Sequence, residues 1–221
     1  RRNTLPADVA PLPGIDPDIS QSMDLFEAEH TERFGFPFWR AAVVAGTAAA
    51  MIAAATGLLG MGESPPDSNQ NAVVTWYNRS VAKIGAGPWC DMGITWEAWH
   101  SGNVVAVCGG PGRGFALTTA HAADFRRRGL WMYGARGIRP GDVVFFSWSR
   151  GETIGSIDHV GLVEHVYADG SFTTIECNIG NACRREHRDA TYVVGYGRPP
   201  YASSPTPAPA AAGGTWFLGG A

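Results

Sequence analysis

The feature that most constrains the fold is a change of hydrophobic period within residues 71–202. In the first half, apolar residues recur at helical spacing, as in NAVVTWYNRSVAKIG, where Val74, Tyr77 and Val81 share one face. In the second half, the segments GDVVFFSW, HVGLVEHVY, SFTTIEC and TYVVGYG have the pattern of strands, and Asp-Gly and Gly-Asn turns separate them. Helices followed by a run of strands predict an α+β domain with helices packed on an antiparallel sheet.

Composition divides the chain into five segments. They are an N-terminal extension with a short predicted helix (1–40), an apolar helix (41–62), a linker (63–70), the globular domain (71–202) and a low-complexity tail of Pro, Ala, Ser and Gly (203–221). The sequence does not begin with Met, so we expect a processed chain or a piece of a longer product.

The apolar segment is uncharged from Ala41 to Gly62. A helix of about 20 apolar residues can span a bilayer. Its many Ala and Gly residues also suit close packing between helices. We therefore expect one continuous helix, separate from the domain, that either crosses a membrane or packs within a protein assembly.

The charge of the chain excludes one class of partner. Lys and Arg number 17 and Asp and Glu number 20, which gives a formal net charge of -3. Such a chain lacks the basic surface that neutralises phosphates, so we expect no nucleic-acid partner.

The segment GPWCDMGITWEAWHSGN, residues 87–103, places a cysteine at the start of a predicted helix. A thiol in the first turn lies near the positive end of the helix dipole, which favours the thiolate. Cys90 is thus a candidate nucleophile, and its backbone N–H is a natural oxyanion donor because the first amides of a helix are unpaired. Trp89 is expected to form a wall of the substrate groove, while other tryptophans nearby belong to the core.

A nucleophilic cysteine needs an imidazole as its base, and the chain has six histidines. Four are poorly placed, in the N-terminal extension, on predicted helices or in the charged loop RREHRD: His30, His100, His121 and His187. His159 and His165 remain, on one predicted strand. They are six residues apart, so regular alternation puts both on the same face and does not choose between them.

The segment TTIECNIGN supplies candidates for orienting the imidazole. Glu176 and Asn178 are two residues apart and are expected to share a face of a strand, with Cys177 facing the other way. Either side chain can accept the imidazole N–H, and the Asn178 amide can donate to an oxyanion.

Five motifs in order resemble the CHAP domain, the cysteine- and histidine-dependent amidohydrolase or peptidase of phage and bacterial cell-wall lysins. They are GPWCDMGITW, IRPGDVVFF, DHVGLVEHV, IECNIGN and VVGYGRPPY, within about residues 71–202. The resemblance implies a papain-like cysteine hydrolase. It also implies that Cys90 is the nucleophile, His159 the base, Glu176 the residue that orients the base and Asn178 the polar residue beside them.

Two departures from the family pattern bear on the site. Cys177 stands where the family usually has Gly, and we expect this to be tolerated because its side chain faces away. The segment NRSVAKIGAG lacks the carboxylates of the calcium loop that some relatives carry, so we expect no calcium there. Cys177, Cys183 and His187 have a zinc-like spacing without a fourth ligand. We expect no metal and no cofactor.

The resemblance implies a peptidoglycan hydrolase that cuts an amide bond, either the muramoyl–alanine amide or a stem-peptide bond. Membrane or phage-particle subunits are the expected partners of residues 41–62 and the tails. The expected location is outside the cytoplasm, on a membrane facing the cell wall or in a phage virion, as a lysin or tail hydrolase. The alternative is a structural or assembly protein of a phage particle whose CHAP-like domain is catalytically silent.

The remaining cysteines allow a disulfide. Cys177 and Cys183 lie on either side of the turn NIGNA, and a chain that doubles back there brings them within bonding distance. We expect this pair to be joined, with free thiols or a bond to Cys108 as alternatives. Such a bridge braces the loop after the Glu176 strand without consuming Cys90.

Overall fold

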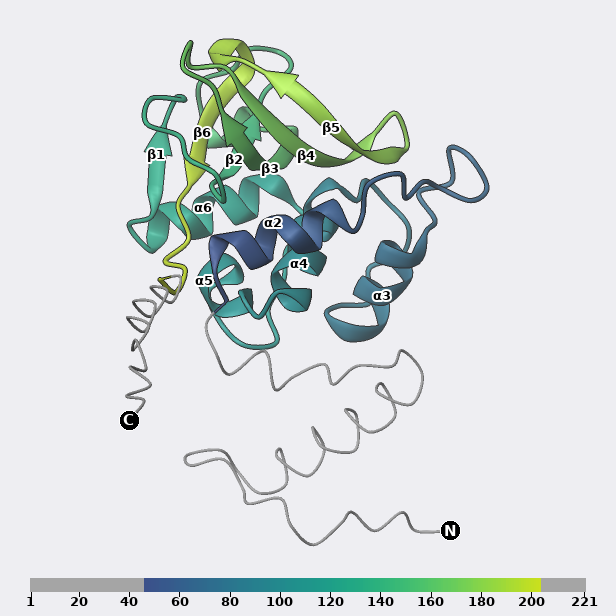
Figure 1. Cartoon of the computed structure of the whole chain (residues 1–221). Coiled ribbons are helices and arrows are strands. Elements are labelled where there is room, and N and C mark those ends of the chain that lie inside the picture. The colour runs from purple at the N-terminus through teal and green to yellow at the C-terminus, as the bar shows by residue number, and fades with distance from the viewer. Residues whose placement is uncertain (1–45, 204–221) are drawn as a thin grey trace, which may run out of the picture.

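The structure is a computed structural model that describes residues 46–203. Within them, helices come first and a six-stranded sheet follows, which confirms the α+β class (Figure 1). The elements are α2 (Ala48–Thr56), α3 (Ala72–Ser80), α4 (Cys90–His100), α5 (Val104–Cys108), α6 (Thr118–Arg127), β1 (Trp131–Tyr133), β2 (Val143–Phe146), β3 (His159–Val166), β4 (Phe172–Ile179), β5 (Ala182–Arg188) and β6 (Val193–Gly197), with short 3₁₀ helices η1 (Ile154–Ser156) and η2 (Ala190–Tyr192).

The sheet has the strand order β1-β6-β2-β3-β4-β5, and each neighbouring pair is antiparallel. Strands β2 to β5 follow one another as a meander, and β6 returns between β1 and β2. Strand β3, which begins at His159, is thus a central strand with partners on both sides.

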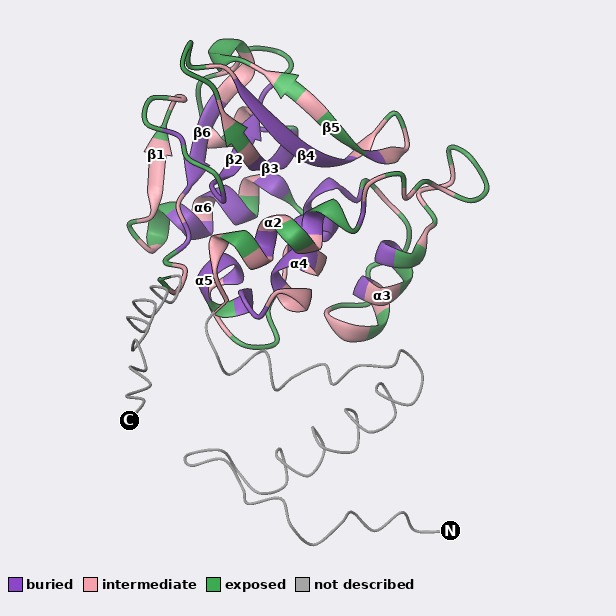
Figure 2. Cartoon of the chain, in the orientation of Figure 1, coloured by how far each residue is buried: buried purple, intermediate pink, exposed green. Residues whose placement is uncertain are grey.

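Both faces of the central strands are buried, which explains uninterrupted apolar runs such as VVFF. One face packs against the helices through Val143, Phe145, Val160, Leu162 and Ile175. The other face forms a separate cluster with Val144, Phe146, Val163, Phe172 and Tyr196. Figure 2 shows this burial along the central strands and the helices beneath them, with exposed residues on β5 and the loops.

Two strands were not predicted. β1 is only three residues long. β5 lies at the edge of the sheet and includes most of RREHRD, which the sequence predicted to be a loop. Its residues are largely polar and exposed, so the hydrophobic alternation that identifies a half-buried strand is missing.

The prediction of a continuous, separate helix over 41–62 is wrong in the described part of that segment. Helix α2 has nine residues and contacts α4, and Met51 and Ala55 are completely buried in the main core. Leu58, just after the helix, is buried in a third hydrophobic cluster, together with Val73, Val74 and Tyr77 of α3. The small side chains allow α2 to pack closely on α4, so the segment belongs to the folded core instead of lying outside it.

The predicted linker is also bonded to the domain. The Glu63 backbone N–H donates to the Asn181 carbonyl, and the Glu63 carboxylate accepts from the Trp89 indole N–H. Across residues 46–203, every helix is too short or too polar to cross a bilayer. The predicted short helix within 1–40, the first residues of 41–62 and nearly all of the C-terminal tail lie outside the described residues.

Candidate active site

The candidate nucleophile, Cys90, is the first residue of α4, as the sequence predicts. The first hydrogen bond of this helix runs from the Gly93 N–H to the Trp89 carbonyl, at 3.0 Å, so the amides of the first turn have no helical partner. Cys90 lies in the same hydrophobic cluster as Ile157 and Val160. Helix α4 also contacts β3 and β4, the strands that carry His159 and Glu176.

The environment of the thiol differs from the expectation. Burial, followed by the charge of Asp91, raises the pKa of Cys90 to about 12. The predicted effect of the helix start is present, but removing the sulfur from water outweighs it. The thiol is therefore neutral until a base takes its proton.

The structure corrects the role expected for Trp89. Its side chain is completely buried among the residues packed around α3, and its indole N–H donates to Glu63 Oε1 at 2.9 Å. A buried indole cannot wall a substrate groove. Trp89 instead fixes the chain immediately before Cys90.

The candidate base, His159, is the first residue of β3 and is 4% exposed. Its Nε2 lies 2.8 Å from Glu176 Oε2. Since an ionised carboxylate only accepts, Nε2 carries the proton and Nδ1 has a free lone pair. Among residues 46–203, Nδ1 has no hydrogen-bond partner, and no hydrogen bond joins the imidazole to Cys90 Sγ. One nitrogen is held and the other is available for a proton.

Glu176 is a completely buried carboxylate that accepts bonds from three side chains. Besides His159, Arg188 donates from Nε to Oε1 and from Nη2 to Oε2, both at 2.8 Å, and the Thr174 hydroxyl donates to Oε1. Burial alone would raise the pKa of Glu176, but the hydrogen bonds from His159 and Arg188 outweigh it and lower the pKa to about 2. Glu176 is therefore ionised at neutral pH and holds the imidazole in one orientation.

The structure separates the two histidines that regular alternation left equivalent. The β3–β4 register shifts between Val163 and His165, so Glu164 is an extra residue in β3. His165 is exposed and packs edge-on against Tyr167. The expectation that His159 and His165 share a face is wrong because of this irregularity, and only His159 meets a carboxylate in the site.

The end of β4 also departs from alternation. Asn178 has a φ of 64°, and the β4–β5 register shifts between Glu176 and Ile179. Its side chain is half-buried and has no hydrogen-bond partner among the described residues. Asn178 therefore follows Glu176 in the chain without sharing its regular strand geometry.

The predicted disulfide is present and joins Cys177 to Cys183, with Cα atoms 3.9 Å apart. A Cβ built on Gly93 would lie 2.8 Å from Cys177 Sγ, so Cys177 faces α4, as expected. The bond uses the two thiols of the zinc-like spacing. No group of three or more His, Cys, Asp or Glu side chains that could hold a metal occurs within residues 46–203.

Two residues of the site were missed from sequence. Trp148 is 40% exposed and stacks on His159 at a ring distance of 5.4 Å. The Arg188 guanidinium lies over Trp148, 5.1 Å from the ring centre, while bonding to Glu176. Position alone offers a weak signal: Trp148 follows the VVFF strand by two residues, and Arg188 lies within the charged run RREHRD.

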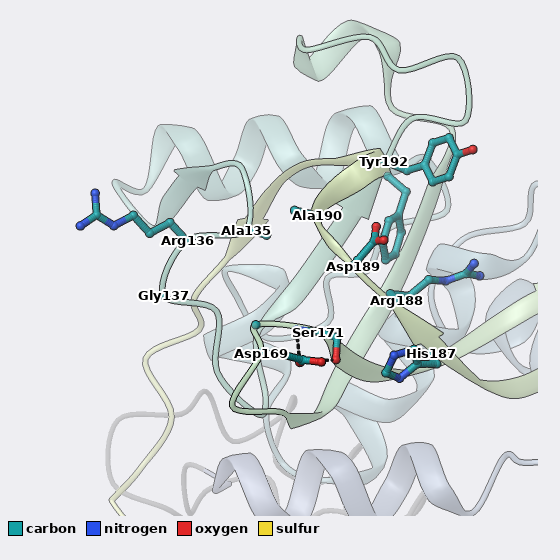
Figure 3. Close-up of a pocket in the computed structure, with 12 residues that line it drawn as sticks. Ala135, Arg136, Gly137, Asp169, Ser171, His187, Arg188, Asp189, Ala190 and Tyr192 are labelled. Carbon is teal, nitrogen blue, oxygen red and sulfur yellow. Dashed lines mark hydrogen bonds between the residues drawn. The ribbon is translucent and has the colours of Figure 1, made fainter.

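A groove of about 900 Å³ borders this cluster (Figure 3). Arg188 and Phe146 line it, and the Phe146 ring lies 6.0 Å from that of His159. Asp169, His187 and Asp189 supply polar groups around it. The groove therefore offers a mixed polar surface on the same side of the sheet as the histidine–glutamate pair.

One of three comparisons with known proteins found a match. The sequence model of the CHAP domain family matches residues 82–178, a range that contains Cys90, His159, Glu176 and Asn178. Neither a curated protein nor a solved structure was found that matches the chain. The family consists typically of cysteine- and histidine-dependent amidohydrolases and peptidases, and the match covers α4, the central strands and the histidine–glutamate pair. Residues 82–178 of this chain are a CHAP domain.

Proposed function

We propose that this protein hydrolyses an amide bond of peptidoglycan, with Cys90 as nucleophile and His159 as base. The observation that carries the proposal is the binding of His159 Nε2 to Glu176, which leaves Nδ1 free. A tautomer fixed in this way has its basic nitrogen ready for the thiol proton. The family match to residues 82–178 supports the amidase or peptidase class and a peptidoglycan substrate.

The reaction begins with proton transfer from Cys90 Sγ to His159 Nδ1. The pKa of the buried thiol is raised, so the thiolate forms only together with an imidazolium that Glu176 stabilises. The thiolate attacks the carbonyl carbon, and the oxygen takes the negative charge. The Cys90 backbone N–H, which has no helical partner, is the proposed donor to that oxygen.

The intermediate collapses when His159 Nδ1 returns its proton to the leaving nitrogen. An amine departs and a thioester to Cys90 remains. Water, deprotonated by His159, then attacks the thioester and releases the acid and the thiol. The half-buried Asn178 amide is a further candidate donor to the oxyanion or the substrate.

Trp148 and the adjoining groove are the surfaces that substrate is proposed to contact. The indole is partly exposed directly beside the His159 ring, and the groove continues past Arg188. The substrate lies outside the cytoplasm, where disulfides such as Cys177–Cys183 persist. We therefore propose an extracytoplasmic protein, either a phage lysin or a virion-associated hydrolase that opens the wall.

The test compares the two free cysteines, both of which are buried. Cys90→Ala should abolish lysis of purified peptidoglycan while leaving the circular dichroism spectrum unchanged. Cys108→Ala is the matched control and should retain lysis. Mass spectrometry of the digest identifies the new amino terminus and thereby the bond cut. Lysis by the Cys90→Ala protein would exclude the thiolate mechanism, and an inactive wild-type protein would favour a catalytically silent assembly role.

A further inference from the structure

A second histidine–carboxylate pair lies directly beside Cys90 in the helical layer. Asp91 is the second residue of α4, and His121 comes from α6. His121 Nδ1 lies 2.7 Å from Asp91 Oδ1, and both side chains are 0% exposed. The helix that begins with the nucleophile thus carries a completely buried carboxylate at its next position.

The partners of His121 determine how many protons the pair holds. Its Nε2 lies 3.3 Å from the Val107 carbonyl, which only accepts, so Nε2 carries a proton. A second proton lies between Nδ1 and Asp91. The pair is either imidazolium with carboxylate or imidazole with carboxylic acid, and its net charge is zero in both forms.

The His121 ring is held rigidly in this position. It stacks with Phe115 at a ring distance of 4.3 Å and with Phe125 at 4.9 Å. Within residues 46–203, His121 is the only ion-pair partner of Asp91, and Asp91 Oδ2 has no hydrogen-bond partner. The charge on Asp91 is therefore cancelled by one side chain alone.

An ionised Asp91 without a partner would oppose ionisation of the acidic groups near it. After burial, Asp91 is the next cause that raises the pKa values of Cys90, Tyr77, Glu97 and Cys108. These groups lie on or beside α3, α4 and α5. Glu176 adds a smaller effect on Cys90, and Arg113 and Arg128 act in the opposite sense on Cys108. Carboxylates from both layers therefore raise the pKa of Cys90.

We propose that Asp91 and His121 are a positioning pair that controls how readily the Cys90 thiol loses its proton, with His121 cancelling the Asp91 charge. A bare carboxylate beside Cys90 would oppose the thiolate. The effect on catalysis rests on the proposed function of Cys90, whereas the effect on the thiol does not.

The test measures the rate at which iodoacetamide alkylates Cys90 in the full chain between about pH 6 and pH 10. Mass spectrometry of the Cys90 peptide separates this thiol from Cys108. His121→Gln leaves the carboxylate uncompensated and should slow alkylation at pH 8 by about tenfold. Asp91→Asn removes the carboxylate together with the proton that it shares with His121, so the pair stays neutral and the rate should stay within about twofold of the wild type.

The double variant and a matched control sharpen the result. With Asp91→Asn present, adding His121→Gln should change the alkylation rate by less than about twofold, because no charge remains to be cancelled. Asp124→Asn removes a carboxylate that pairs with Arg127 and Arg128 on the same helix as His121. It should leave the Cys90 rate unchanged.

A purely structural role would give a different pattern. Thermal stability would fall in both single variants, but their alkylation profiles would coincide with the wild type or move in the same direction. Either pattern overturns the proposal. If His121→Gln alone does not fold, the alkylation rates of Asp91→Asn and of the double variant are compared instead. A tenfold difference between those two rates would also overturn the proposal. Failure of the proposed function is a separate result, namely lysis by the Cys90→Ala protein.

Discussion

Within residues 46–203, a histidine–carboxylate pair occurs in the sheet and another in the helices, with nearly equal hydrogen-bond lengths. His159 lies 2.8 Å from Glu176, and His121 lies 2.7 Å from Asp91. Both nitrogens of His121 are bonded and the ring is sealed between phenylalanines. His159 keeps one nitrogen free beside the partly exposed Trp148. This free nitrogen is the feature that makes His159, and not His121, the candidate base.

The largest expected effect comes from removing the ring with the free nitrogen. His159→Ala should lower the rate of peptidoglycan hydrolysis by about a thousandfold or more, because the imidazole is the proposed acceptor of the thiol proton. Initial rates of turbidity loss measure this. His165→Ala, at an exposed position, is the control and should retain substantial activity. Equal losses in both variants would contradict the assignment.

The second prediction concerns the carboxylate of the sheet pair. The pKa of Glu176 is lowered from 4.5 to about 2, so its ionised form stabilises the folded state by about 3 kcal/mol above pH 4.5. That contribution should disappear as the pH falls from about 4.5 to about 2. In urea unfolding experiments, the unfolding free energy of Glu176→Gln should not show this decrease between about pH 4.5 and pH 2. The same variant should turn over substrate about 10 to 100-fold more slowly.

A matched control for the acid transition is Glu164→Gln. Glu164 pairs with Arg185 at the surface, on the strand that carries His159. Its variant should follow the wild-type decrease in unfolding free energy. The interpretation fails if the unfolding free energies of Glu176→Gln and the wild type change with pH in the same way below pH 4.5.

The third prediction concerns the room beneath Glu176. A Cβ at residue 161 would lie 2.6 Å from Glu176 Cγ, so Gly161→Ala has to displace the carboxylate. We expect activity to fall by about tenfold and stability by about 1 to 3 kcal/mol. Gly155→Ala is the control, because its nearest atom, Thr153 Oγ1, is 3.8 Å away. Full activity in Gly161→Ala would show that the orientation of Glu176 tolerates movement.

The smallest expected effect concerns the disulfide beside the sheet pair. Denatured, unreduced protein should contain two reactive thiols, Cys90 and Cys108, because Cys177 and Cys183 are joined. Reduction should lower stability by a few kcal/mol at most, since the bridged loop is short, with a smaller effect on turnover. Four reactive thiols before reduction would exclude the bond.

The hydrophobic pattern was sufficient to predict the central strands and α4. Strand β2 is an uninterrupted apolar run because both of its faces are buried, and α4 is buried over most of its length. Cys90 was identified as the start of a helix for the same reason. These features depend on the local sequence and on burial, and the pattern of apolar residues along each segment reflects both.

The features that sequence did not predict depend on tertiary contacts. The extra residue Glu164 in β3 has no sequence signal, yet it moves His165 to the opposite face of the sheet from His159. The role of Arg188 was not predicted from the charged run RREHRD, because it depends on the pairing of β5 with β4, which brings Arg188 to Glu176. The high pKa of Cys90 depends on burial by distant segments, which no local pattern records.

The position of α2 has a consequence for how the protein can be cut. The family match begins at residue 82, but Met51 and Ala55 fill the core beneath α4. A fragment trimmed to residues 82–178 would expose the apolar surface of α4 that Met51 and Ala55 cover. Burial of a side chain of Met size stabilises the folded state by about 1.5 to 3 kcal/mol. The smallest piece that a laboratory or a protease can release in folded form is therefore expected to begin upstream of α2, well before the boundary drawn by sequence similarity.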